Sequence, residues 1–109
     1  ADALANVEAI AAVPGVDALF VGPFDLSIAL GLPPGDNDGE PLFDAALARI
    51  GEAAKAAGIA TAVLANADLT PLRARQGFRM ISVVTDAMVL NRAAAADLAR
   101  TREALSVGL

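Results

Sequence analysis

The sequence has no cysteine, histidine, tryptophan or tyrosine among its 109 residues, and only four phenylalanines. Without cysteine the chain forms no disulfide and no thiolate metal site. Without histidine it cannot by itself supply a serine or cysteine nucleophile with an imidazole base, or an imidazole ligand for zinc. Any metal that the chain binds must be held by oxygen atoms, which favours Mg²⁺, Mn²⁺ or a similar hard ion.

Positive charge is also scarce, since 13 acidic and 8 basic residues give a net charge of −5. This balance argues against a phosphate-binding surface for DNA or RNA, and there is no aromatic run to stack on single-stranded bases. No uninterrupted apolar run approaches the roughly 18 residues that a membrane helix needs, and the N-terminus has no basic region followed by an apolar stretch. We therefore expect no nucleic-acid partner, no membrane partner and a cytoplasmic protein.

Aliphatic residues are abundant, and 56% of the chain is hydrophobic. Three short apolar runs bounded by turn residues, at 17–22, 59–64 and 80–85, are typical of strands covered on both faces. Periodic apolar spacing predicts helices between and around them, at 2–13, 25–31, 42–57, 68–76 and 87–105, with Asp68 and Asp86 as N-caps. The Pro- and Gly-rich residues 32–41 predict a loop.

Alternating helices and strands of these lengths indicate βαβ units and a parallel sheet. Three strands are too few for a closed barrel, which takes eight strands and about 250 residues, and the first predicted helix has no strand before it. An incomplete α/β protein therefore fits the sequence better than a small independent domain.

The run from Phe20 to Ser27 lies where the first predicted strand ends and a helix begins, at the edge where parallel α/β folds bind ligands. Gly22 lets the backbone approach a ligand, and Pro23 fixes the turn. The amides of Phe24 and Asp25 could point at an anion, and Asp25 also offers a carboxylate. The residues alone leave two roles open for Asp25, a helix cap or a ligand.

Residues 16–31, which contain Gly22-Pro23-Phe24-Asp25-Leu26-Ser27, closely resemble the HpcH/HpaI-type class II aldolases, the 2-keto-3-deoxy acid or pyruvate aldolases. The likeness continues through 57–59, 63–65 and 77–86, in the right order. It implies that residues 1–109 are a partial TIM-barrel domain. They would form the C-terminal portion of a TIM (β/α)8 barrel: the last three βα units, with three parallel strands and helices, plus the preceding helix.

The resemblance also implies a carbon–carbon lyase that cleaves 2-keto-3-deoxy or 4-hydroxy-2-oxo acids to pyruvate and an aldehyde. A divalent ion (Mg²⁺, Mn²⁺ or Co²⁺), held by one Glu and one Asp, would stabilise the enolate. Asp25 matches the metal-binding Asp, and the amide of Phe24 matches the one that contacts the pyruvate carboxylate. Gly22 and Pro23 would shape the same wall. Leu64, at the end of the second strand, would line the apolar side of the pocket or serve ordinary barrel packing.

The family's metal-binding Glu, its base-side His and its transition-state Arg would lie before residue 1. No catalytic residue is therefore expected within the chain, and the fragment alone is expected to be inactive. Two alternatives stay open, an acyl-CoA lyase of the same superfamily and a non-catalytic truncated barrel module. A homo-oligomer is implied as well, because family members assemble through their last helix and loops.

Other candidate residues are weaker. Asp36-Asn37-Asp38-Gly39 hints at a calcium loop, but Pro34 and Ala45 would occupy the first and last ligand positions of an EF-hand, so a solvated turn is expected. Relatives often carry a His-Pro pair where Glu40-Pro41 stands. Asp86 could face the pocket or cap the last helix. The remaining basic residues are interpreted as solvated surface: Arg73, Arg75, Arg79, Arg92, Arg100 and Arg102.

Overall fold

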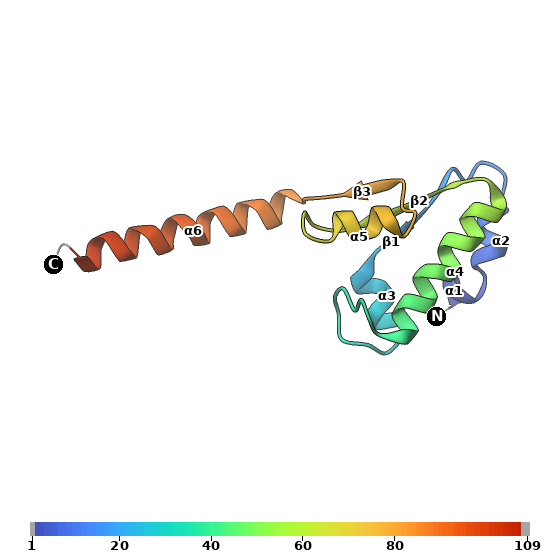
Figure 1. Ribbon diagram of the computed structural model, residues 1–109, viewed down its shortest axis with the longest axis horizontal. Helices are drawn as coiled ribbons and strands as arrows, with labels where there is room; N and C mark the ends of the chain where they lie inside the picture. Colours follow the sequence, from blue (N-terminus) through green and yellow to red (C-terminus); the bar gives the residue numbers. More distant parts are fainter. Residues whose placement is uncertain (1, 108–109) are drawn as a thin grey trace.

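The computed structural model describes residues 2–107 (Figure 1). Helices and strands alternate as the sequence predicts. In chain order the elements are α1 (Asp2–Ala5), α2 (Val7–Ala11), β1 (Ala18–Val21), α3 (Pro23–Ala29), α4 (Pro41–Ala57), β2 (Ala60–Leu64), α5 (Thr70–Arg75), β3 (Met80–Ser82) and α6 (Asp86–Val107).

The three strands form one parallel sheet in the order β1-β2-β3, which confirms the predicted topology. The register places Phe20 beside Ala62 and Ala62 beside Met80. β3 is shorter than the predicted run of 80–85. Ser82 pairs with Leu64, the last residue of β2, so residues 83–85 have no strand of the described chain beside them.

The core lies between the sheet and α4, which packs against β1 and β2, while α2 packs against α4. Phe43 and Val63 are fully buried there, and burial of each large apolar side chain contributes about 1.5–3 kcal/mol. Alternation along the strands turns Phe20 and Met80 to the opposite face, where they are 61% and 56% exposed. The core cluster comprises Val7, Ala11, Val21, Phe43, Leu47, Ile50, Ala53, Val63 and Phe78.

The first predicted helix, 2–13, is interrupted at Asn6 and ends at Ala11. The Asn6 side-chain amide donates a hydrogen bond to the Asp2 carbonyl at 2.9 Å. Such a local bond offers the backbone an alternative to continuous helix. At the end of α4, by contrast, Gly58 adopts the left-handed conformation that glycine favours, with φ of +72°.

The prediction that Asp68 caps the following helix is wrong. α5 begins at Thr70, and the turn before it is closed by Asn66. The Asn66 side-chain oxygen accepts a hydrogen bond from the Leu69 amide at 2.9 Å, and the Thr70 hydroxyl donates to the Asn66 carbonyl at 2.7 Å. Asn66 therefore closes the turn before α5, whereas the sequence assigned the capping of this helix to Asp68.

α6 begins at Asp86, and the hydroxyl oxygen of the preceding residue, Thr85, accepts a hydrogen bond from the Met88 amide at 3.4 Å. Asp86 is therefore the first helical residue, and the prediction that it caps the helix is wrong. Its carboxylate accepts a hydrogen bond from the Ala87 amide at 2.7 Å. The helix projects away from the sheet (Figure 1), and all its side chains from Asp86 to Ser106 are exposed. Within residues 2–107, no helix is both long enough and apolar enough to cross a membrane.

Candidate functional site

The segment Gly22–Asp25 directly follows the carboxyl end of β1 and forms the start of α3. Gly22 is the N-cap residue and Pro23 occupies the first helical position. Proline suits this position because its fixed φ is helical and its missing N–H would have no intrahelical partner. α3 therefore begins two residues before the predicted range of 25–31.

Asp25 lies in the first turn of α3 and not at its cap. The helix has no side-chain cap, so the interpretation of Asp25 as a capping residue is wrong. The residue is exposed, and its carboxylate makes no hydrogen bond to another residue within the described range 2–107. The carboxylate is therefore available to a ligand.

Gly22 and Asp25 approach each other closely. A Cβ atom on residue 22 would lie 2.6 Å from the Asp25 Oδ2 atom, which is closer than real Cβ atoms approach other atoms. The backbone angles of Gly22, φ −94° and ψ 107°, are open to any residue. A larger residue at position 22 would thus require the Asp25 carboxylate to move from its present position, whereas the backbone there does not require glycine.

A cavity of about 560 Å³ opens beside β1, between this strand and the first two helices. Its wall is mostly aliphatic, with Phe20 on one side and Gly22 and Asp25 at the start of α3. Asp25 is the single ionisable residue among the described residues that line it. The cavity lies along the edge of β1 that has no partner strand within residues 2–107.

The other predicted site residues lie at the same edge of the sheet. Pro23 is buried, whereas Phe24 is 54% exposed. Leu64 is half-buried at the end of β2 and does not line the cavity. Because Val21 pairs with Val63, Leu64 follows at the level of Gly22 on the neighbouring strand.

Comparison with known proteins identifies the family. Residues 1–93 match the model of the HpcH/HpaI aldolase/citrate lyase family. The chain belongs to this family. It is 43% identical over 99 residues to a hydroxypyruvate/pyruvate aldolase of Chromohalobacter salexigens, and the match covers 87% of this chain and 37% of that protein. It is 37% identical over 113 residues to a 2-keto-3-deoxy-L-rhamnonate aldolase of Salmonella schwarzengrund. That match covers 96% of this chain and 39% of the aldolase.

Among solved structures, an HpcH/HpaI aldolase/citrate lyase family protein from Burkholderia cenocepacia superposes with a TM-score of 0.80 at 38% identity. The match covers 91% of this chain and 38% of that one. This member of the family therefore spans well under half the length of the relatives it matches. Its three parallel strands and their helices are part of a TIM barrel, as the resemblance implied.

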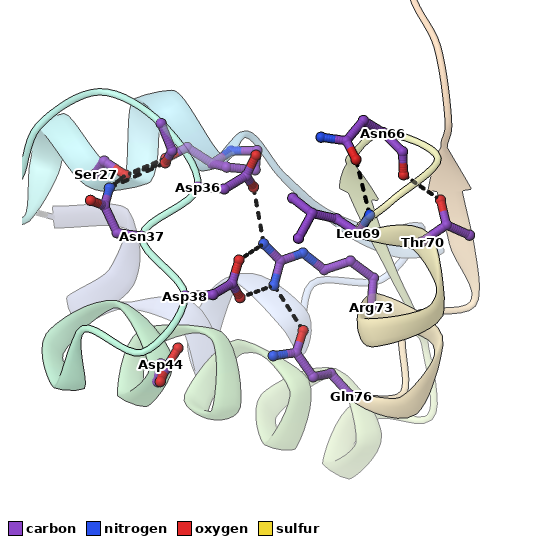
Figure 2. Close-up of polar contacts among 12 residues, drawn as sticks. Ser27, Asp36, Asn37, Asp38, Asp44, Asn66, Leu69, Thr70, Arg73 and Gln76 are labelled. Atoms are coloured by element: carbon purple, nitrogen blue, oxygen red, sulfur yellow. Dashed lines mark hydrogen bonds and ion pairs between the residues drawn. The ribbon is translucent and has the colours of Figure 1, made fainter.

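This family member also contains a buried ion-pair cluster that sequence reasoning missed. Arg73 of α5 is fully buried, so its interpretation as solvated surface is wrong. Its guanidinium donates to both carboxylate oxygens of Asp38, at 2.5 and 2.9 Å, and to Asp36 at 3.0 Å (Figure 2). Burial alone would lower the pKa of Arg73, but the hydrogen bonds to Asp38 and Asp36 outweigh it and raise the pKa above its ordinary value.

The acidic loop is therefore partly solvated, as expected, but its two aspartates are paired with Arg73. Asp36 and Asp38 direct their carboxylates at Arg73, and no group of three or more His, Cys, Asp or Glu side chains within residues 2–107 could hold a metal ion. The available signal was the loop 32–40, which contains three acidic residues, Asp36, Asp38 and Glu40, and no basic residue. That pattern indicated a cation supplied from elsewhere in the chain.

Proposed function

We propose that the chain is part of a metal-dependent pyruvate-type aldolase in which Asp25 is a metal ligand. The observation that carries the proposal is the position of this carboxylate and its lack of hydrogen-bond partners among the described residues. It is the one ionisable group on the described wall of an apolar cavity, it makes no hydrogen bond to another described residue, and it lies against a glycine at the carboxyl end of a barrel strand. Ligands of TIM-barrel enzymes bind at this end.

The residues present fit a hard divalent ion. A carboxylate oxygen suits Mg²⁺, Mn²⁺ or Co²⁺, and the space at Gly22 keeps Asp25 accessible. Because no three-residue donor group exists among residues 2–107, the further ligands must come from outside them. The Glu that the resemblance implies before residue 1, water and the keto acid would supply them. When bound, such an ion acts as a Lewis acid toward the keto acid.

The neighbouring residues would bind and orient the substrate. The Phe24 amide lies in the first turn of α3, where backbone N–H groups have no intrahelical partner, so it can donate to the carboxylate of pyruvate. Gly22 and Pro23 would form the wall beside it. Leu64, which lies outside the cavity at the end of β2, would contribute an apolar side chain from the neighbouring strand. We assign no proton-transfer group to this chain, which would be inactive alone. The substrates would be 2-keto-3-deoxy or 4-hydroxy-2-oxo acids, with pyruvate and an aldehyde as products.

The assembled protein would be a homo-oligomer. α6 carries exposed apolar side chains along its length, among them Met88, Leu90, Leu98 and Leu105. A second copy is a natural partner for such a helix. An acyl-CoA lyase of the same superfamily and a non-catalytic barrel module remain the rival functions. A coding sequence upstream of residue 1 for a strand that ends in Glu would favour the enzyme over the module.

The test is Asp25→Asn in the complete enzyme. Asn keeps the size of the side chain but brings no charge to the ion, so Mn²⁺- or Mg²⁺-dependent release of pyruvate should be abolished. The melting temperature of the metal-free protein should hardly change, because Asp25 is exposed and its carboxylate bonds to no other residue within 2–107.

The matched control is Asp17→Asn, an exposed aspartate beside the other end of β1, which should keep full activity. Near-normal metal-dependent turnover by Asp25→Asn would refute the ligand assignment.

A further inference from the structure

Two polar side chains among residues 2–107 are completely buried, and they belong to different helices. Ser27 lies on α3 and Arg73 on α5, and both are 0% exposed. The loop between α3 and α4 passes between them, and each holds one side of it (Figure 2). Residues 33–39 of this loop are called the bridging loop below.

Ser27 joins the bridging loop to the first turn of α3. Its hydroxyl oxygen lies 2.7 Å from the carbonyl oxygens of both Pro23 and Gly35. The same oxygen accepts a hydrogen bond from the Asn37 side-chain amide at 2.7 Å. Because Pro23 stands two residues before Asp25, a displacement of the bridging loop would reach the turn that carries this carboxylate.

Arg73 fixes the other side of the bridging loop. It forms a bidentate pair with Asp38, and it also reaches Asp36, on the other side of Asn37 (Figure 2). The Gln76 side-chain oxygen accepts a further hydrogen bond from Arg73 at 2.9 Å. A planar guanidinium can make this forked contact, whereas the point charge of lysine cannot.

We propose that Arg73 is a positioning residue for the candidate site. It holds Asp36 and Asp38, these fix Asn37 and Gly35 against Ser27, and Ser27 sets the first turn of α3 from which Asp25 projects. The proposal rests on the function proposed above, because it assigns to Arg73 an effect on the ligand carboxylate and not a contact with substrate.

A purely stabilising role explains the cluster poorly. A buried ion pair costs desolvation, and an apolar replacement of similar shape is often as stable or more stable. In addition, the buried Nε atom of Arg73 has no hydrogen-bond partner within the described residues. Arg73 contacts two aspartates, one on either side of Asn37, and so fixes the geometry of the loop. An apolar contact could not reproduce this geometry.

The test uses Arg73→Met in the complete enzyme, with Arg49→Met as the matched control. Arg49 also makes a forked contact, to Glu8, but on the exposed surface between α4 and α2. Loss of Arg73 leaves two partly exposed aspartates, which is milder than leaving a buried arginine without its partners. Asp36→Asn, which keeps a hydrogen-bonding side chain, is the second variant if Arg73→Met fails to fold.

Three quantities are measured: the Mn²⁺ dissociation constant by calorimetry, the KM for the keto acid against kcat, and backbone hydrogen exchange over 22–40 in the metal-free protein. Arg73→Met should weaken Mn²⁺ binding and raise KM by about tenfold, in the range known for groups that orient metal ligands. Exchange over 22–40 should become faster. Arg73→Lys should recover only part of the loss, and Arg49→Met should change none of the three.

Equal Mn²⁺ affinity and equal exchange over 22–40 in Arg73→Met and Arg49→Met would overturn the proposal and leave Arg73 a structural residue. Failure of the proposed function is distinguishable from this outcome. In that case the unmodified enzyme itself would show no Mn²⁺-dependent release of pyruvate. Hydrogen exchange in the metal-free protein would still report whether Arg73 orders the first turn of α3.

Discussion

Replacement of Gly22 by alanine tests the local geometry most directly. The added Cβ would lie 2.6 Å from Asp25 Oδ2, and ordinary contact begins at 3.4 Å, so the carboxylate must move by about 0.8 Å. A metal–oxygen bond of about 2.0–2.6 Å does not survive a shift of that size without rearrangement. Misplacement of a reacting group by about 1 Å can cost about a hundredfold in rate. We therefore expect Gly22→Ala to lose about a hundredfold in metal-dependent turnover.

The stability of Gly22→Ala should change little. Alanine fits the backbone angles of residue 22 and reduces the freedom of the unfolded chain, which stabilises by about 0.4–1 kcal/mol. Alanine is also a poorer N-cap than glycine, which offsets this gain. Turnover and Mn²⁺ affinity of the complete enzyme, with melting of the metal-free protein, separate the two effects.

Gly51→Ala is the matched control for this substitution. A Cβ on Gly51, within α4, would meet nothing within 4 Å, so this variant should keep full activity. It should also be more stable, by roughly 0.5–1 kcal/mol, because alanine is the better helix former. If Gly22→Ala binds Mn²⁺ as tightly as Gly51→Ala does, the steric reasoning at Gly22 and Asp25 is refuted.

Further expectations concern stability and association. Glu8 accepts hydrogen bonds from Arg49 that lower its pKa from 4.5 to about 2, so this exposed pair stabilises the fold above about pH 4.5 and ceases to do so as the pH falls toward 2. Glu8→Gln should thus slightly lower the melting temperature of the complete enzyme at pH 7, but not near pH 2; a pH-independent difference would contradict this. Residues 1–109 expressed alone should associate or unfold without cooperativity, because β1 has one edge without a strand in the described chain and Phe20 and Met80 are exposed. A sharp thermal transition in a clean monomer on size-exclusion chromatography would contradict that expectation.

The elements that the sequence predicted well are those decided by local pattern. The apolar runs at 17–22 and 59–64 became β1 and β2, because an uninterrupted aliphatic segment between turn residues has few alternatives to a covered strand. Gly58 ended α4 for an equally local reason. The candidate site was likewise predicted from a local pattern, since Gly22 to Asp25 are contiguous in the sequence.

The features that the sequence did not reveal depend on partners distant along the chain. Arg73 looks like an ordinary helical arginine until Asp36 and Asp38, more than thirty residues earlier, are placed beside it. The pairing of β3 ends at Ser82, opposite Leu64, the last residue of β2, and a run of residues does not show where its partner strand ends. The close approach of Gly22 and Asp25 required coordinates, because a motif shows neither rotamer nor distance.

The row that joins Phe20, Ala62 and Met80 across the sheet has a consequence for curvature. Side chains on the inner face of a closing sheet are crowded together, and a row of three large residues would resist bending toward that face. Here a small residue separates two large ones, and Ala62 is fully covered although both neighbours are more than half exposed. Ala62 thus leaves room for Phe20 and Met80 to lean toward each other as the strands bend. A large side chain at position 62 would flatten the sheet and oppose closure of the barrel before any site at its rim could form.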